Sequence, residues 1–509
     1  GANAVYFKSG ELRITGGKFL GTGAQQTYGY VADGYKATGA ALVVENVGGE
    51  TAYDKIKSVY INGGTFLSDH SDAVQSYTAG MAGIASLKGF IYGGTFSSDV
   101  SALLAENLIV KDNGDGTYSV IPNPSLTYVA KIGSYQYTTL ADAVKGAKTG
   151  ETIELLEDVT LTELVKLNVK DLVLDLKGKT VTANCKKAFE VSAKTTIKNG
   201  TIIAEQRCVD TRTNINLTLE QLSLEATSLK HGNPQPITIG GYENGTTVTM
   251  SKVNINAALG YGIISFVETD VVATDCQIKG YSAIYAKENN ASNSEFTLNN
   301  CTLEAVSPAF AGDVNAFSLI AIRANNVTVN VNGGLLRGTG TVSVMSFHGY
   351  NDALDIIFVK DCKVIFDSNA TLEGDLIIEA KTNFEDNTII LPAAYSEDLK
   401  AEGFYLKDNG DGTVTPTKVV DFEDVDFAYT NTTDIEGLTI SYKRTFKNHS
   451  VWNAMFLPFE VPASMLLDNY QIAEWTGMLY ETDGDDTVTA TGIELTKIKN
   501  EAAILQANH

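Results

Sequence analysis

Residues 197–202 read IKNGTI: an apolar residue, any residue, Asn, two further positions and a second apolar residue. The pattern recurs about a dozen times along the chain, with Asn, Asp or Gly at its third position in most copies. Examples are INGGTF at 61–66, LNNCTL at 298–303 and VKDCKV at 359–364, and from residue 176 onward the copies begin 21 to 33 residues apart. Short β runs repeating at this interval indicate one unit stacked on itself, so the pattern predicts an all-β chain wound as a parallel β-helix.

The Asn, Asp or Gly position is predicted to form a left-handed corner between two strands, because these residues tolerate positive φ best. The apolar residues on either side of the corner should then point into the core. The predicted corner residues are Asn199, Asp275, Asn300, Gly333, Asp361 and Asp386.

Three of the five cysteines, Cys276, Cys301 and Cys362, are predicted to share the slot after this corner. Other copies carry Gly, Leu or Val there, which indicates a small interior site where a free thiol behaves as an apolar residue. The alternatives are a disulfide between Cys276 and Cys301 or a metal site. No Cys-x-x-Cys or His-rich spacing supports the metal.

We expect three domains. Residues 1–121 should form a first β-helix module that ends in a hairpin, and residues 125–418 a capped β-helix of about nine coils that ends in a second hairpin. Residues 420–509 should form a small β-sandwich-like domain that is truncated at the end of the sequence. The hairpins are predicted at the two copies of DNGDGT, residues 112–117 and 408–413, because Asn-Gly and Asp-Gly supply positive φ. Calcium is the alternative for these loops, although the EF-hand spacing is not met.

A short helix near residues 139–148 is predicted to cap the second module, since Leu140, Ala143 and Val144 fall on one helical face. Thr139 is the expected N-cap and Gly150 the expected stop. Such a helix would cover the strand edge and core that a stack of coils exposes at its end.

The composition limits the partners of the chain. Its 61 acidic and 38 basic residues give a formal net charge of -23, which disfavours nucleic acid and anionic membranes. No stretch of about 18 apolar residues occurs, so we expect no membrane insertion. No signal peptide is visible, and the opening GANAVYF lies in a strand-like run, so we expect the natural protein to begin further upstream.

The segment YTTLADAVKGAKTGETIELLEDVTL at 137–161, followed by the repeats, resembles the capped start of pectin-lyase-like right-handed β-helix proteins. GGTFSSDVSALLAEN at 93–107 and SYKRTFKN at 441–448 look like modules of large secreted or surface-attached proteins of gut bacteria. The resemblance implies a right-handed winding and a secreted or cell-surface location. Such repeats occur in adhesins, passenger domains and polysaccharide enzymes alike.

The motifs of polygalacturonase-like hydrolases are not present as sets. His231-Gly232 and His348-Gly349 lack the preceding Gly of Gly-His-Gly, and no Arg-x-Lys occurs. An acid–base pair of His348 with Asp352 or Asp355 is a further hypothesis, against which ordinary polar surface is the alternative. No catalytic residue is therefore assigned, and neither a resident cofactor nor a metal ligand is expected.

The best candidate site comes from the runs after the corner in successive repeats, such as VDTRT (209–213), AIYAKE (283–288) and LIAIRA (319–324). If alternate residues point outward, basic and aromatic side chains form a stripe, in which cations bind carboxylates or sulfates and rings stack on sugars. The candidate ligand-binding residues are Arg212, Phe266, Tyr285, Lys287, Arg323 and His348. The alternative is a solvated face with ordinary ion pairs such as Asp210–Arg212.

We therefore expect an extracellular, adhesin-like protein without catalysis that presents a β-helix surface to a polysaccharide or a host surface protein. The alternative is a polysaccharide lyase or glycoside hydrolase acting on an acidic glycan.

Overall fold

Nearly all secondary structure in the described residues is β-strand, with two short α-helices, α1 (Leu140–Gly146) and α2 (Ser464–Leu467). Contacts divide the chain into one unit of Gly1–Glu402 with Leu406–Pro416 and a second unit of Gly403–Tyr405 with Thr417–His509. None of the described helices has the length and apolar character needed to cross a bilayer. The computed structural model describes the chain except for residues 1, 25–26, 30–35, 47–55, 79–85, 213, 227, 242, 288, 307–317, 340–341, 348–350, 353–354, 357–358, 375, 378–385, 396–404, 418, 424–438, 444–459, 468–470, 483–487, 501–502 and 506–509.

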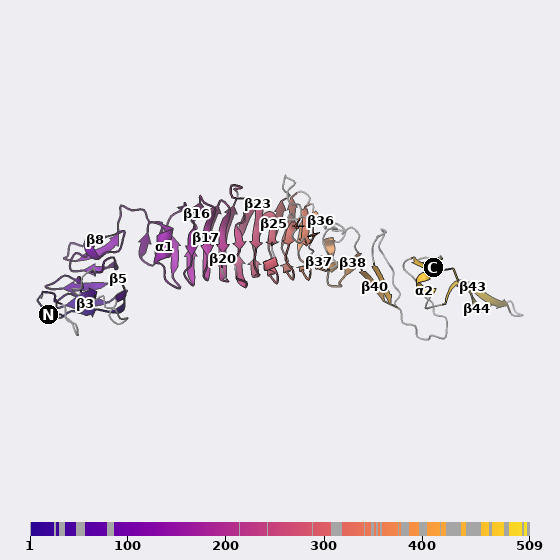
Figure 1. Cartoon of the computed structure of the whole chain (residues 1–509), viewed down its shortest axis with the longest axis horizontal. Helices are drawn as coiled ribbons and strands as arrows, with labels where there is room; N and C mark the ends of the chain where they lie inside the picture. Colours follow the sequence, from indigo (N-terminus) through magenta and orange to yellow (C-terminus); the bar gives the residue numbers. More distant parts are fainter. Residues whose placement is uncertain are drawn as a thin grey trace. The chain divides into compact units, whose positions relative to one another are not determined.

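Residues 152–392 contain a large, parallel-rich sheet in which strands pair with strands one repeat later, consistent with a solenoid-like fold (Figure 1). The pairings form three ladders. The first comprises β12 (Thr152–Leu155), β15 (Leu172–Asp175), β18 (Thr195–Ala204), β20 (Asn216–Ala226), β22 (Thr246–Ser251), β24 (Thr269–Thr274), β26 (Glu295–Asn299), β29 (Thr328–Asn332), β34 (Lys363–Phe366) and β37 (Thr388–Pro392).

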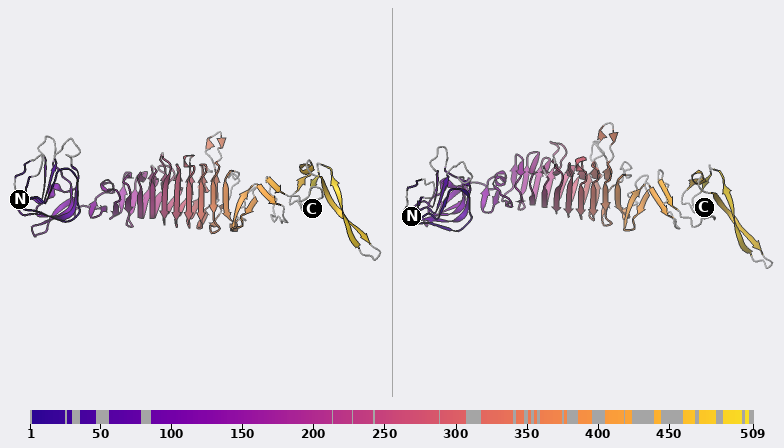
Figure 2. Two further views of the ribbon diagram at one scale, coloured as in Figure 1. Left: turned by 90° about the horizontal axis from the view of Figure 1, so that it is seen from below. Right: turned by 60° about the horizontal axis from the view of Figure 1, so that its bottom comes forward.

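The second ladder shares the C-terminal halves of β18 and β20 with the first. Its other strands are β13 (Val159–Leu161), β16 (Thr180–Ala183), β23 (Asn254–Ser265), β25 (Gln277–Ala286), β27 (Thr302–Val306), β30 (Leu335–Thr339) and β35 (Thr371–Glu373). The third ladder shares the ends of β23 and β25 and includes β14 (Val165–Leu167), β17 (Lys187–Val191), β19 (Arg207–Thr211), β21 (Ile237–Ile239), β28 (Ser318–Ile322), β31 (Val342–Phe347) and β36 (Leu376–Ile377). The two further views in Figure 2 show these strands side by side in chain order.

Alternate residues of the first ladder stack into one buried apolar column. Ile197 pairs with Leu219, and Leu298 pairs with Val331, and all four side chains are fully buried. Full burial of such a side chain stabilises the fold by about 1.5–3 kcal/mol. The apolar residues that flank the corners in the sequence therefore form the core, as predicted.

Helix α1 lies at the end of the stack that begins with β12 (Figure 1) and buries Leu140, Ala143 and Val144. The Thr139 hydroxyl accepts a hydrogen bond from the Asp142 backbone N–H at 3.1 Å, which confirms the predicted N-cap. The helix ends at Gly146, so the predicted stop at Gly150 is wrong. Gly150 instead lies in the following turn with φ +77°.

A left-handed corner is confirmed at five of the six predicted residues, Asn199, Asp275, Asn300, Gly333 and Asp361, but the ladders have two kinds of corner. Asn199, Asp275 and Asn300, with φ between 51° and 60°, separate first-ladder from second-ladder strands. Asn326 and Asp361, with φ of 55° and 60°, precede first-ladder strands instead. The sequence pattern is the same at both corners, because each is a left-handed residue between two apolar runs.

The predicted shared cysteine slot is therefore correct for two residues and wrong for Cys362. Register places Cys301 directly beside Cys276, whereas Cys362 lies beside Val327 and Asn387. The same correction moves Asp361 to the second kind of corner. Asp386 lies beside it one repeat later, where its carbonyl accepts from the Asp361 N–H at 2.8 Å, and a left-handed backbone at Asp386 stays a prediction. All three cysteines are buried free thiols, and the hydrogen bond between Cys276 and Cys301 lowers the pKa of Cys276 and raises that of Cys301.

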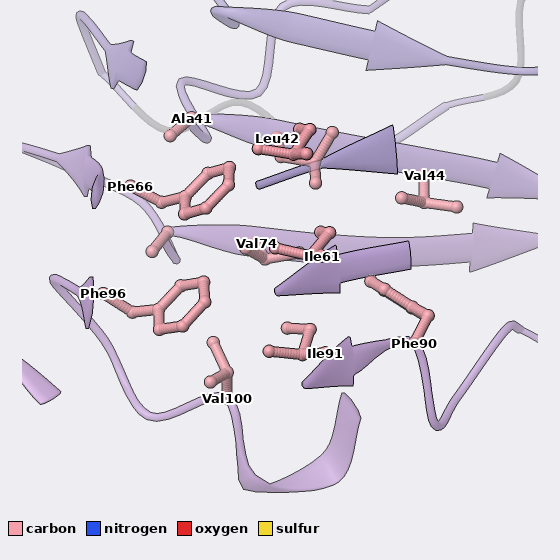
Figure 3. Close-up of a cluster of buried hydrophobic side chains, with 12 residues drawn as sticks. Ala41, Leu42, Val44, Ile61, Phe66, Val74, Phe90, Ile91, Phe96 and Val100 are labelled. Carbon is pink, nitrogen blue, oxygen red and sulfur yellow. The ribbon is translucent and has the colours of Figure 1, made fainter. Parts of the chain in front are cut away.

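The first module, residues 2–122, has two parallel ladders of its own. One comprises β1 (Val5–Phe7), β4 (Leu42–Asn46) and β6 (Val74–Thr78). The other comprises β2 (Gly10–Ile14) and β3 (Lys18–Gly21), which both pair with β5 (Ile56–Ser68), followed by β7 (Ile91–Phe96). The rings of Phe19, Phe66 and Phe96 stack at centroid distances of 4.7 and 5.1 Å. Figure 3 shows Phe66 above Phe96 beside Ile61 and Ile91, which places equivalent letters of the repeat in one column.

An antiparallel hairpin of β8 (Leu108–Asp112) and β9 (Tyr118–Pro122) encloses the first DNGDGT, as predicted, and β9 also pairs with β7. The second DNGDGT copy lies between β38 (Tyr405–Asp408) and β39 (Thr413–Thr417). Its turn repeats the first in detail: Asp112 and Asp408 each accept from the backbone N–H two residues later at 2.8 Å. These carboxylates therefore stabilise the turn by accepting hydrogen bonds from its backbone.

Short strand pairs make up the described part of the second unit. They are β40 (Val419–Glu423) with β41 (Thr439–Lys443), β42 (Val461–Pro462) with β45 (Ile504–Leu505), and β43 (Ile472–Thr482) with β44 (Val488–Ile498). The β character is confirmed, and the sandwich stays a prediction.

Candidate ligand-binding site

The third ladder places the predicted candidates on its outer side. In each strand the residues that alternate with the core positions form an outer column, which runs from Glu190 and Asp210 through Thr238 and Ile264 to Tyr285. The residues that directly follow these strands extend the ladder by one more hydrogen bond each. For example, the Lys287 N–H donates to the Ser265 carbonyl and the Arg323 N–H donates to the Ala286 carbonyl, both at 2.8 Å.

Four of the predicted residues lie in this second line, which we call the basic stripe: Arg212, Phe266, Lys287 and Arg323. Phe266, Lys287 and Arg323 follow consecutive strands of the ladder, about 4.8 Å apart. Arg212 is exposed and the other three side chains are half-buried. The sixth predicted residue, His348, lies outside the described residues, so its pairing with Asp352 or Asp355 stays a hypothesis.

Two cations of the basic stripe rest on aromatic rings. The Lys287 ammonium lies 5.0 Å from the centre of the Phe266 ring, and the Arg323 guanidinium lies 5.7 Å from that of Tyr285. Such contacts are worth about 0.5–1 kcal/mol at exposed sites and more when desolvated. Within the described chain, Lys287 makes no ion pair with a carboxylate.

Tyr285 itself is only 2% exposed, so its ring is not available to a ligand. It belongs to a cluster on the outer side of the ladder that we call the tyrosine cluster. Tyr261 lies 4.8 Å from Tyr285 and 6.4 Å from Tyr281, measured between ring centres. The members are Tyr261, Ile264, Tyr281, Tyr285 and Ala321, with Phe266 packed at the edge. Tyr285 therefore contributes a buried ring against which the Arg323 guanidinium lies.

The other end of the outer column is covered by charges, which we call the ionic cluster: Lys187, Glu190, Arg207, Asp210 and Arg212. The fully buried Asp210 carboxylate contacts Lys187, Arg207 at 3.1 Å and Arg212 at 3.2 Å. Glu190 contacts Arg212 at 3.2 Å and Lys187 at 3.7 Å. The predicted Asp210–Arg212 ion pair is present, within a larger network of three cations and two carboxylates.

Sequence reasoning missed Lys187, Glu190 and Arg207. Register places Lys187 opposite Arg207 and Glu190 opposite Asp210, so like charges face each other on neighbouring strands. The ion pairs form between positions that are not directly opposite, such as Lys187 with Asp210 and Arg212 with Glu190. An alignment of strands rather than of corner motifs would have brought these charges together.

The described residues contain no group of three or more His, Cys, Asp or Glu side chains arranged to hold a metal ion. In the DNGDGT turns, Asp115 and Asp411 each accept from a Thr hydroxyl and a backbone N–H, which lowers the pKa of both carboxyls. Calcium at these loops stays an untested prediction.

No family model, curated protein or solved structure matches this chain.

Proposed function

We propose that this chain is a non-catalytic, adhesin-like protein, secreted or attached to a cell surface, that binds an acidic glycan on the basic stripe. In the same proposal, residues 127–391 wind as a right-handed, pectin-lyase-like parallel β-helix. The three ladders support the winding, because each strand pairs with the strand one repeat later. The resemblance of the modules to secreted proteins supports the location.

The observation that carries the binding proposal is the contrast between the stripe and the rest of the protein. The chain has a net charge of -23, yet Lys287 and Arg323 follow neighbouring strands and are each held on a ring. At physiological ionic strength charges are screened beyond about 8 Å, so binding at the stripe depends on the charges beside it rather than on the net charge of the whole chain. Carboxylates or sulfates along a sugar chain are the groups that complement such a line.

The carboxylates beside the stripe favour binding over cleavage. A hydrolase or lyase needs an acid or base that is free to exchange protons with the substrate. Asp210 is fully buried among three cations, and Glu190 is held by two. Neither carboxylate is placed to exchange a proton with a glycan.

The test is calorimetric titration of the full chain with polygalacturonate, alginate and chondroitin sulfate, with dextran as a neutral reference. We expect at least one acidic polymer to bind and dextran not to bind at the stripe. Lys287→Ala and Arg323→Ala should each weaken binding roughly ten- to a hundredfold, because each removes a charged contact worth about 1.5–3 kcal/mol.

Lys279→Ala is the matched control, since it removes the same charge from strand β25, which Lys287 directly follows. Lys279 lies on the second ladder and pairs with Glu304 at 2.6 Å, so its loss should leave the affinity within about twofold. Equal losses in Lys279→Ala and Lys287→Ala would mean that only net charge matters. Release of reducing sugar or unsaturated uronate from any polymer would overturn the non-catalytic assignment.

A further inference from the structure

A hollow of about 480 Å³ lies between the first module and the start of the second, away from the basic stripe. Its walls come from four separate segments: Arg13 on β2, Tyr60 and Asn62 on β5, residues 131–133, and Glu151 with Thr152 and Glu154. The volume falls within the range of about 300–1,000 Å³ that is typical of small-molecule sites.

Aromatic and polar contacts join the two modules beside this hollow. The rings of Tyr92 and Tyr135 meet edge to face at 4.8 Å across the junction, and the Tyr135 hydroxyl donates to the Glu106 carbonyl at 2.7 Å. The Ser134 hydroxyl donates to the Asn62 side-chain oxygen at 3.2 Å. These contacts hold the two walls in one arrangement, which lowers the entropic cost of binding.

Each charged group in the hollow is already oriented. The Arg13 guanidinium lies over the Tyr60 ring at 4.7 Å and 3.7 Å from the Glu151 carboxylate. The other oxygen of Glu151 accepts from the Lys148 backbone N–H at 2.8 Å. On the other side, Lys131 and Glu154 pair at 2.9 Å, and this contact lowers the pKa of Glu154.

The lining therefore alternates donors and acceptors without a net charge. Arg13 and Lys131 donate, Glu151 and Glu154 accept, and the Asn62 amide does both. An anion would meet the two carboxylates and a cation would meet the two basic groups. Neighbouring hydroxyls of a sugar ring each donate and accept a hydrogen bond, so a neutral sugar complements all of these groups at once.

We propose that this hollow is a second glycan site, which binds one or a few rings of a neutral oligosaccharide. The Arg13 guanidinium, held over the Tyr60 ring, donates to two sugar hydroxyls. The Glu151 carboxylate accepts from the neighbouring hydroxyl. The site is independent of the basic stripe, because the two share no residue and complement different charges.

The test is calorimetric titration of the full chain with maltohexaose, cellohexaose, laminarihexaose, mannohexaose and xylohexaose. We expect at least one of them to bind with a dissociation constant of about 1 mM or lower. Arg13→Ala and Glu151→Gln should each weaken that binding by roughly tenfold or more, because each loses a charged hydrogen bond to the sugar.

Arg337→Ala is the matched control: Arg337, on β30 far along the chain, also forms an ion pair at the surface, with Glu373 at 2.9 Å. It should leave the affinity unchanged, as should Lys287→Ala, which tests the other site. No binding of any of the five sugars, or equal binding by the Arg13 and Glu151 variants and the control, would overturn the proposal. Loss of acidic-glycan binding alone would count only against the basic stripe.

Discussion

The outer column of the third ladder is buried in two different ways along its length. At the β17–β19 end the ionic cluster covers it, and at the β23–β28 end the tyrosine cluster covers it. The ionic cluster is stable only while every buried charge keeps its partner, whereas the tyrosine cluster is stabilised by the apolar area that its rings bury. The difference also decides what the cations face, because buried acids contact those of the ionic cluster while aromatic rings lie against Lys287 and Arg323.

The largest effect should come from removing the anion at the centre of the ionic cluster. Asp210→Ala leaves Lys187, Arg207 and Arg212 facing one another with only Glu190 to compensate. We expect a loss of about 3–5 kcal/mol in the free energy of unfolding, measured by urea denaturation. Glu373→Ala breaks the exposed pair with Arg337 and should cost about 1 kcal/mol or less. Equal losses in the two variants would show that burial of Asp210 is not what makes the network critical.

Converting the ionic cluster into an apolar one tests whether apolar packing can replace the buried charges at this end of the outer column. The combined variant Lys187→Met, Arg207→Leu and Asp210→Leu removes the buried charges together and keeps the Glu190–Arg212 pair. Buried ion networks replaced by apolar residues of similar volume are often neutral or more stable by about 1–4 kcal/mol. We expect urea denaturation to show stability equal to or above that of the wild type. A loss as large as that of Asp210→Ala would mean that the charges themselves stabilise this end.

At the other end, Tyr285→Leu keeps an apolar side chain but removes the ring beneath Arg323. The lost ring pair with Tyr261 and the lost cation–π contact should together cost about 1–2 kcal/mol of unfolding free energy. Binding of the acidic polymer should weaken as well, since Arg323 loses its support. Tyr285→Phe keeps the ring and should retain most of the binding. Weakening of the same size in Tyr285→Phe would assign the effect to the hydroxyl instead.

Much of the fold could be predicted because inward and outward residues alternate visibly around each corner. The core column through Ile197 and Leu298 and the stripe through Lys287 and Arg323 both follow from that alternation. Cys362 could not be placed, since both kinds of corner satisfy the same six-letter pattern. Only the pairing of Lys363 with Thr328 separates them.

The side chains that bury the outer column could not be predicted from the repeat pattern, for a physical reason. Alternation predicts the side to which Tyr285 points. Its burial, however, depends on the packing of Tyr261 from the preceding strand of the ladder and of Tyr281 from the same strand. The hollow at the module junction was equally invisible, because Arg13 and Glu151 meet only once two separate stacks lie together. Contacts between elements decide both features, and no local spacing encodes them.

The smallest stability effect should come with a gain of binding. Glu190→Gln keeps an oxygen that accepts from Arg212 but removes a charge from the ionic cluster, so we expect a loss of about 1 kcal/mol or less. The same change frees positive charge at the Arg212 end of the basic stripe and should raise the affinity for polygalacturonate roughly two- to fivefold. Glu373→Gln removes an equal charge away from the stripe and should leave that affinity unchanged. If both variants bind more tightly by the same factor, overall charge rather than the stripe governs binding, and the two ends of the outer column do not differ in function.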